Sequence, residues 1–175
     1  MRTLTDHLVQ YAAYHRDRRN IATHFIGIPM IVLAVAVLLS RPSFSLFGLA
    51  LTPAVLVVVA AVILYLVLDL RFGVVMAVLY AMFVWAGFVV AQQSTGAWLA
   101  TGVGAFVVGW IVQFVGHYWE GRKPAFVDDL AGLIIGPLFV VAEAAFLLGL
   151  RDDVRREVEK RAGPTHGRAR SVAAG

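Results

Sequence analysis

The sequence contains no cysteine, which limits the chemistry that it can perform. Disulfide bonds, thiolate catalysis, iron–sulfur clusters and cysteine zinc sites are all excluded. Charged residues are also scarce, at 15% of the chain, whereas soluble domains have about 25%. Hydrophobic residues reach 60%, and the mean hydropathy is +0.80. This composition indicates a polytopic membrane protein, in which nitrogen and oxygen atoms must hold any metal ion.

Several familiar motifs are also missing. No Gly-x-Gly-x-x-Gly run follows a predicted strand and no Walker sequence occurs, so no organic cofactor site is indicated. Residues 1–20 lack the apolar core of a secretory signal peptide, so the first spanning helix is expected to direct insertion itself. The length of 175 residues allows one compact bundle. We therefore expect a single membrane-embedded helical domain over residues 1–150, followed by a basic cytoplasmic tail over 151–175 that is partly disordered.

Two uncharged stretches predict the first pair of membrane spans. Ile21 to Ser40 has no Asp, Glu, Lys or Arg, and at about 1.5 Å per residue it matches the ~30 Å hydrocarbon core of a bilayer. Pro53 is well placed to open a second helix over Ala54 to Leu68. Between these spans, Phe44 to Thr52 is expected to be a short interfacial helix or a loop.

The uncharged run from Phe72 to Trp119 predicts two further spans. As a single helix rising about 1.5 Å per residue, this run would be far longer than the bilayer is thick, so the chain must turn back. The polar segment 92–96 is the best place for that turn. The third span is therefore expected at about 73–91 and the fourth at about 97–118.

The last apolar segment, Leu130 to Leu150, is open to three interpretations. It contains Gly136-Pro137 and Glu143, so it is a fifth span, a broken helix or a re-entrant element. Basic residues gather in the leader and in the tail, namely Arg2, Arg16, Arg18, Arg19, Arg151, Arg155, Arg156, Lys160, Arg161, Arg168 and Arg170. Both ends are therefore expected on the cytoplasmic side, which requires an even number of crossings. We predict an all-α, polytopic membrane bundle of four transmembrane helices plus a re-entrant or interfacial fifth helix.

This topology brings three of the five histidines to one membrane face. His15 precedes the first span, His24 lies in its first turns, and His117 lies at the end of the fourth span. His15 and His24 would occupy opposite faces of one continuous helix, so the chain must bend between them. Asn20 as the N-cap of the first span, after a turn at residues 17–19, would supply that bend. Convergent imidazoles indicate a metal site.

The fourth span adds two polar residues to the same face as its histidine. Gln113, His117 and Glu120 follow i, i+4, i+7 spacing. A histidine and a glutamate side by side form a ligand pair used in bundle-core metal sites. The competing interpretation is that such residues cap helix ends or meet lipid headgroups. His7 and His166 are expected to face solvent.

Three glycines on the fourth span recur every seven residues, at Gly102, Gly109 and Gly116. Small residues at such spacing favour the close approach of a second helix in a membrane. We interpret them as packing positions rather than as a ligand site.

Two groups of residues resemble the fungal-type 2-hydroxy fatty acid dioxygenases, a family of small membrane proteins. The first group is Tyr14-His15, Asn20, His24 and Pro29. The second is the run from Trp110 to His117, then Glu120, Arg122-Lys123-Pro124-Ala125, Asp128 and Glu143. Together they bracket nearly the whole chain. The Gln-Phe-Val-Gly-His stretch at 113–117 is the more specific part.

The resemblance implies an iron(II)-dependent membrane enzyme that uses O2 to shorten a long-chain 2-hydroxy fatty acid by one carbon. The iron ligands are then expected to be His15, His24 and His117. The catalytic residues are expected to be Glu120, Gln113 and Asn20, and the substrate-binding residues Arg122, Lys123 and Tyr14. Family members usually have the glutamate four positions after the histidine, whereas Glu120 is three after His117. Glu120 is therefore either a direct metal ligand or a residue that supports the ligands, and both alternatives stay open.

The expected partners are the hydroxy acid, O2 and membrane lipid, with no nucleic acid. The expected location of this multi-pass protein is a bacterial inner (cytoplasmic) membrane, with the site at the cytoplasmic face. Neutral imidazoles would also suit zinc or copper, so the residues alone do not choose the metal. Two alternatives stay open: haem held by a histidine pair, and a lipid-binding or packing protein without oxygenase activity. A Soret band would identify the first, and a lack of stoichiometric metal the second.

Overall fold

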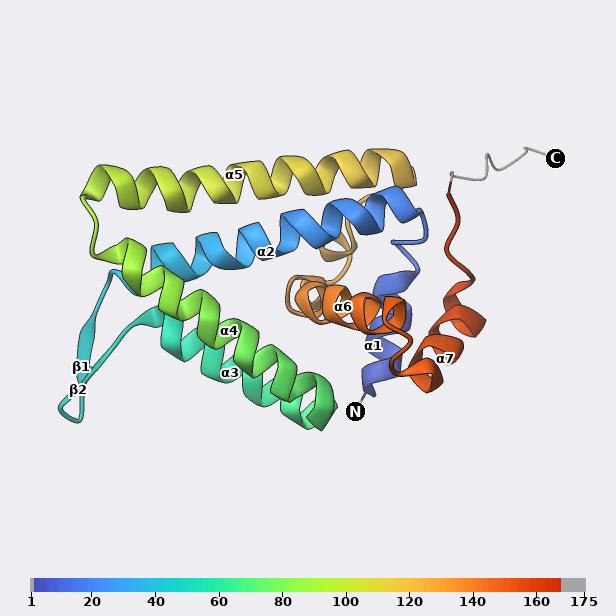
Figure 1. The fold of residues 1–175 in the computed structure, drawn as a ribbon, viewed down its shortest axis with the longest axis horizontal. Coiled ribbons are helices and arrows are strands. Elements are labelled where there is room, and N and C mark those ends of the chain that lie inside the picture. The colour runs from blue at the N-terminus through green and yellow to red at the C-terminus, as the bar shows by residue number, and fades with distance from the viewer. Residues whose placement is uncertain (1, 168–175) are drawn as a thin grey trace. The chain divides into compact units, whose positions relative to one another are not determined.

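The computed structural model describes residues 2–167, most of which are helical (Figure 1). The elements are α1 (Leu4–Ala12), α2 (Arg18–Ser40), β1 (Phe44–Leu46), β2 (Leu49–Leu51), α3 (Pro53–Leu68), α4 (Leu70–Ala91), α5 (Thr95–Glu120), the 3₁₀ turn η1 (Ala125–Val127), α6 (Ala131–Leu147) and α7 (Asp152–Ala162). They form two compact units, one from the described residues up to Ile26 and from Ile111 onward, the other from residues 27–110. The predicted all-α fold class is confirmed.

Within residues 2–167, three helices are long and apolar enough to cross a membrane, namely α2, α4 and α5. They correspond to the first, third and fourth predicted spans. The second predicted span is helix α3, which is apolar but has only 16 residues. At about 1.5 Å per residue it is shorter than a ~30 Å hydrocarbon core. Helix α6 would make a span only together with α7, and a bend of 113° separates the two, at the place where a re-entrant or interfacial element was predicted.

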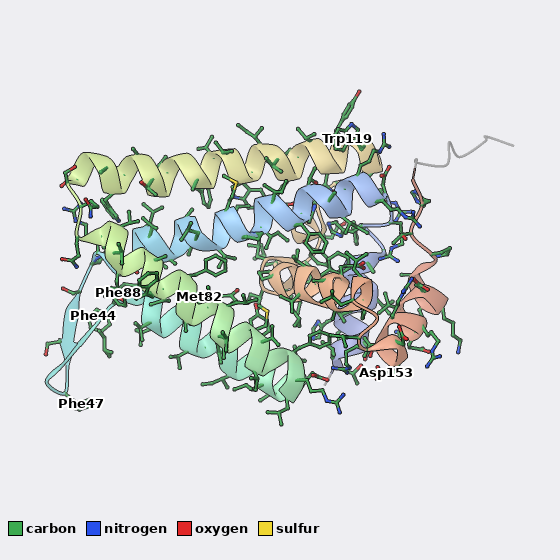
Figure 2. All side chains as sticks on the ribbon, in the orientation of Figure 1. Phe44, Phe47, Met82, Phe88, Trp119 and Asp153 are labelled. Carbon is green, nitrogen blue, oxygen red and sulfur yellow. The ribbon has the colours of Figure 1, made fainter. Side chains whose placement is uncertain are left out.

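In the unit of residues 27–110, α3 and α4 form a helical hairpin (Figure 1). Asp69 alone separates them, because its extended backbone ends α3 and its side chain accepts a hydrogen bond from the Phe72 backbone N–H (2.9 Å) at the start of α4. Gly73 then lies against Leu66, where an added Cβ would come within 2.6 Å of the Leu66 Cα. Outer side chains such as Met82 are apolar and exposed (Figure 2). Helices that are apolar all round are typical of membrane spans.

The segment between α2 and α3 is a β-hairpin, so the prediction of an interfacial helix or a loop at Phe44 to Thr52 is wrong. Strands β1 and β2 pair antiparallel, with Phe44 opposite Leu51. The two residues of the turn, Phe47 and Gly48, both have positive φ angles, of 51° and 79°. Two-residue hairpin turns of this kind match the twist of the flanking strands. The Phe47 side chain is almost fully exposed at the tip (Figure 2).

The glycine repeat on α5 packs against α2, as predicted. Cβ atoms added at Gly102, Gly109 and Gly116 would meet Leu38, Ile31, and Thr23 with Asn20, respectively. The first two contacts lie within the unit of residues 27–110, and the third lies within the other unit. Glycine lets helix backbones approach closely in a membrane. The third contact therefore brings the end of α5 against the first turns of α2.

In the other unit, α1 packs against α6 and α7. Thr3 and Asp6 form a reciprocal capping box at the start of α1. The buried side chains of α1 are Leu4, Leu8, Tyr11 and Ala12. Helix α7 buries Val154 and Val158, and Arg161 pairs with Asp6 (3.0 Å). Much of the segment predicted to be the tail is thus folded onto α1, while Arg168 and Arg170 lie outside the described residues.

Candidate metal centre

Three histidines from distant parts of the chain lie together in the unit that contains α1, α6 and α7. His15 is in the loop after α1, His24 is in α2, and His117 is near the end of α5. One ring nitrogen of each lies within 4.8 Å of those of the other two. The ring centroids are 4.4 to 5.1 Å apart, and all three side chains are buried. The histidines predicted to converge are therefore neighbours in space.

Backbone carbonyl groups set the protonation of two of these rings. Nδ1 of His15 lies 2.7 Å from the carbonyl oxygen of Tyr11, and Nδ1 of His24 lies 2.9 Å from that of Asn20. A carbonyl oxygen only accepts, so each Nδ1 must carry the hydrogen and each Nε2 keeps its lone pair. Histidines that bind metals usually donate their other ring N–H in this way. The buried His15 Nε2 has no hydrogen-bond partner in the described part of the chain, which suits a ligand atom.

Two buried amides lie one helical turn before two of the histidines. Asn20 precedes His24 on α2, and Gln113 precedes His117 on α5, each by four positions. Among residues 2–167, the Asn20 Oδ1, Gln113 Oε1 and His117 Nδ1 atoms have no hydrogen-bond partner. Buried polar atoms rarely stay unpaired in proteins. This set of nitrogen and oxygen donors fits a bound cation with a polar substrate beside it.

Aromatic rings cover the histidines. Tyr11 stacks on His15 with the ring centroids 4.2 Å apart and the planes 4° from parallel. Phe139 of α6 lies 4.9 Å from the Tyr11 ring and 5.5 Å from the His15 ring. Burial, with His24 nearby, holds the pKa of His15 well below its usual range. His15 is therefore neutral near pH 7, which is the form that binds a metal ion.

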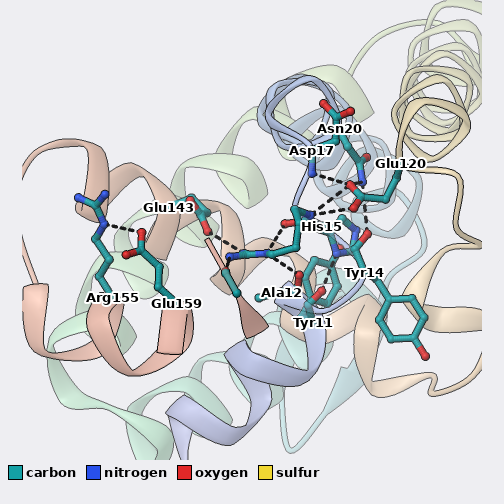
Figure 3. Close-up of polar contacts among 12 residues, drawn as sticks. Tyr11, Ala12, Tyr14, His15, Asp17, Asn20, Glu120, Glu143, Arg155 and Glu159 are labelled. Atoms are coloured by element: carbon teal, nitrogen blue, oxygen red, sulfur yellow. Dashed lines mark hydrogen bonds and ion pairs between the residues drawn. The ribbon is translucent and has the colours of Figure 1, made fainter. Parts of the chain in front are cut away.

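Glu120 lies near the histidines, but its carboxylate is engaged with the loop that carries His15 (Figure 3). It accepts hydrogen bonds from the backbone N–H groups of Arg16 (3.0 and 3.1 Å) and Asp17 (2.9 Å) and from Asn20 Nδ2 (2.9 Å). These bonds tie α5 to that loop and to α2. The carbonyl of Asn20 in turn holds the His24 ring. Glu120 thus orients the segments that present the histidines.

The bend between His15 and His24 is present, but the prediction that Asn20 caps the first span is wrong. Helix α2 begins at Arg18, and the Asp17 side chain accepts a hydrogen bond from the Arg19 backbone N–H (2.8 Å). Asp17 is fully buried and also pairs with the Arg19 side chain (2.6 Å). Asn20 lies within the first turn instead, and its side chain donates to Glu120 (2.9 Å). The Asp17 carboxylate therefore caps α2, whereas the Asn20 side chain bonds to Glu120.

The three residues predicted to bind the substrate lie at an exposed edge. The Tyr14 hydroxyl donates to Asp128 (2.8 Å), and Lys123 pairs with the same carboxylate. Those two partners hold the pKa of Asp128 below its usual range. Arg122 donates to the Ala13 carbonyl (2.7 Å). In Figure 3 the Tyr14 ring points away from His15. The contacts of Tyr14, Arg122 and Lys123 join two loops, and none of the three belongs to the histidine cluster.

Sequence reasoning missed Arg16, which it counted only among the basic residues that orient the chain. The side chain is buried, and its Nε donates to the carbonyls of Ala12 (2.8 Å) and His15 (2.9 Å). Nη1 donates to the Gly163 carbonyl (2.9 Å), and Nη2 lies 3.7 Å from Glu143 Oε1. The available signal was its position directly after His15 in the first family-like group.

His166 is half-buried rather than solvent-facing, as it was predicted to be. Its backbone N–H donates to the Arg16 carbonyl (2.8 Å), and its carbonyl accepts from the Arg18 N–H (2.9 Å). The chain after α7 therefore returns to the loop that carries His15. His7 on α1 is also half-buried. Neither residue belongs to the histidine cluster.

Comparison with known proteins agrees with the two groups of family-like residues. The family described as "Mpo1-like: 2-hydroxy-palmitic acid dioxygenase Mpo1-like" matches residues 1–148. The 2-hydroxy-palmitic acid dioxygenase MPO1 of Saccharomyces cerevisiae is 29% identical over 152 residues, a region that covers 85% of this chain and 83% of the yeast protein. No solved structure matches the chain.

Proposed function

This chain belongs to the Mpo1-like family, and from that premise we propose that it is an iron(II)-dependent membrane dioxygenase of fatty acid α-oxidation. It converts a long-chain 2-hydroxy fatty acid to the acid one carbon shorter. The observation that carries the proposal is the buried cluster of three imidazoles. Two of the rings are hydrogen-bonded to backbone carbonyls through Nδ1, which leaves Nε2 available to bind a metal.

The residues present fit an iron ion. His15, His24 and His117 would hold it through neutral ring nitrogens, which are suitable ligands for iron(II). Three protein ligands leave coordination positions for other groups. A bound iron(II) would supply the place where O2 reacts with the substrate.

The surrounding residues then have distinct tasks. Tyr11 and Phe139 keep water away from the histidines. Glu120 is a positioning residue, because it holds the two segments that carry His15 and His24. Asn20 and Gln113 offer unpaired amide oxygens to the substrate hydroxyl.

The proposed reaction needs no organic cosubstrate. Loss of one carbon as CO2 from a 2-hydroxy acid releases four electrons, which is the number that reduces one O2 to two oxygen atoms at the level of water. Neither a nicotinamide nor 2-oxoglutarate has to supply electrons. This accounts for activity in a chain that shows no dinucleotide or Walker motif.

Purified protein tests the proposal directly. Anaerobically prepared protein should contain iron, and adding 2-hydroxypalmitate should consume O2 and produce pentadecanoate. Palmitate should not react, because it lacks the hydroxyl next to its carboxylate. Equal turnover of both acids would overturn the role of the hydroxyl. A Soret band, or no O2 uptake with either acid, would instead favour the haem-binding or lipid-binding alternative.

We also propose that the protein resides in a bacterial inner membrane with the histidine centre at the cytoplasmic face. The basic residues that flank the apolar helices support this orientation. Reporter fusions at the two termini should both report the cytoplasm. Termini on opposite sides would contradict the orientation and would make α6 a complete crossing.

A further inference from the structure

A cavity of about 430 Å³ lies within the same unit as the three histidines, although none of the three lines it. This volume falls in the ~300–1,000 Å³ range of small-molecule pockets. Its apolar wall is formed by Ile21, Ala22, Phe25, Phe146, Leu147 and Val158. Arg16 and Phe25, which directly follow His15 and His24 in the chain, both line it. The cavity is therefore apolar on one side and adjoins the segments that carry two of the histidines.

The polar side of the cavity has an excess of positive charge. Arg16, Arg18 and Arg155 line it, against Glu143 and Glu159. Arg155 and Glu159 pair with each other (2.9 Å), as Figure 3 shows. Arg16 and Arg18 thus face one remaining carboxylate, that of Glu143.

Arg16 offers a donor to a ligand. Its side chain is about 8% exposed, and its Nη2 atom has no hydrogen-bond partner within the described residues. The nearest carboxylate oxygen, Glu143 Oε1, is 3.7 Å away, beyond hydrogen-bond distance. The other guanidinium nitrogens are held by backbone carbonyls. A buried guanidinium that is fixed at Nε and Nη1, and whose Nη2 has an ion-pair contact with Glu143 but no hydrogen bond, is well suited to bind a carboxylate.

We propose that this cavity binds a single-chain carboxylate amphiphile, with Arg16 Nη2 bound to the carboxylate and the alkyl chain along the apolar wall. The assignment rests on the proposed function, since such a molecule is its substrate class. It makes Arg16 the anchor in place of Arg122 and Lys123, which lie at the exposed edge. Because Arg16 Nε is hydrogen-bonded to the His15 carbonyl, a head group at Arg16 lies beside the loop that carries His15.

Ligand binding to metal-free protein tests the proposal without relying on turnover. Full-length protein in nanodiscs is loaded with parinaric acid, a fluorescent fatty acid, which is then displaced by palmitate, 2-hydroxypalmitate or hexadecanol. Both acids should displace the probe at a concentration about tenfold or more lower than the alcohol, because a charge-assisted hydrogen bond is lost with the alcohol.

Two variants on one helix separate the cavity from general effects on membrane insertion. Ala22→Trp fills the cavity and should weaken binding of both acids by about tenfold. Ile26→Trp, one turn further along α2 and facing outward with 58% of its surface exposed, should leave binding unchanged. Arg16→Gln should weaken the acids and not the alcohol; Ala22→Trp keeps the test valid if Arg16→Gln fails to fold.

The outcomes distinguish this proposal from the proposed function. Unchanged acid binding in Ala22→Trp would overturn the cavity assignment, whether or not the protein consumes O2. Displacement by dioleoyl phosphatidic acid as effective as by palmitate would overturn the single-chain assignment. The expected binding pattern without O2 uptake on 2-hydroxypalmitate would support the cavity and refute the oxygenase.

Discussion

The two compact units of this chain differ in how many polar residues they bury. In residues 27–110 the helices meet mainly through glycines and apolar side chains, with a hydroxyl contact between Tyr65 and Tyr80 (3.2 Å), and the other buried polar residues of this described unit are Ser40 and Thr52. In the other unit the buried polar residues are His15, Arg16, Asp17, Asn20, His24, Gln113 and His117. Unpaired polar atoms are costly inside proteins and membranes. Among the described residues, most of the buried polar atoms that lack a hydrogen-bond partner lie in the unit that holds the three histidines.

Removing one of the three imidazoles should have the largest effect on iron binding and activity. His15→Ala, His24→Ala and His117→Ala should each lose bound iron and all activity, because each removes one of the three proposed ligands. The unit of residues 27–110 should keep the variants folded in the membrane. Metal analysis after anaerobic purification and O2 uptake are the measurements. His7→Ala is the matched control. A His24→Ala protein with full iron and full turnover would contradict the proposal that the three histidines bind iron.

Adding one methyl group to α5 in each unit sharpens the comparison. Gly116→Ala places a Cβ onto Thr23 Oγ1 and Asn20 Oδ1, whereas Gly109→Ala places one 2.7 Å from Ile31 Cγ1. Both should destabilise the protein by about 1–3 kcal/mol, as overpacking does. Gly116→Ala alone should also weaken iron binding, by about 10–100-fold, because it displaces Asn20 behind His24. Equal iron affinities in the two variants would contradict the prediction that only the unit with the histidines binds iron.

A smaller effect is expected from changing the charge of Glu120 while keeping its shape. Glu120→Gln keeps one acceptor but exchanges charge-assisted bonds for weaker neutral ones. Iron affinity, measured by competition with a chelator, should fall by about tenfold, as is usual when a residue supporting the ligands is lost. Glu157→Gln on α7 is the control and should match the parent protein. Complete loss of iron in Glu120→Gln would instead indicate that Glu120 is itself a ligand.

The spans were predictable because uncharged length is a property of the sequence alone. Helices α2, α4 and α5 therefore lie close to where they were expected. The β-hairpin was not predictable, since its turn requires a positive φ at Phe47 as well as at Gly48. A bulky residue seldom adopts that conformation, so the local pattern carried no sign of it.

The expected topology was enough to predict that His15, His24 and His117 lie together. It could not distinguish Arg16 and Asp17 from the other charged residues at the same boundary. Both become buried only because partners far along the chain reach them, with Glu120 binding their backbone N–H groups. Charge near the end of an apolar run predicts orientation, whereas burial of that charge depends on tertiary contacts.

The contact of Glu120 with the loop after α1 also bears on the synthesis of the protein. The residues that it joins, Arg16 and Glu120, are separated by 104 positions. At a translation rate of roughly 5–20 residues per second, about 5–20 s pass between the emergence of the two. During that time His15 and His24 have been synthesised but His117 has not. The three-histidine cluster is therefore completed late in biogenesis, only after α5 has been synthesised.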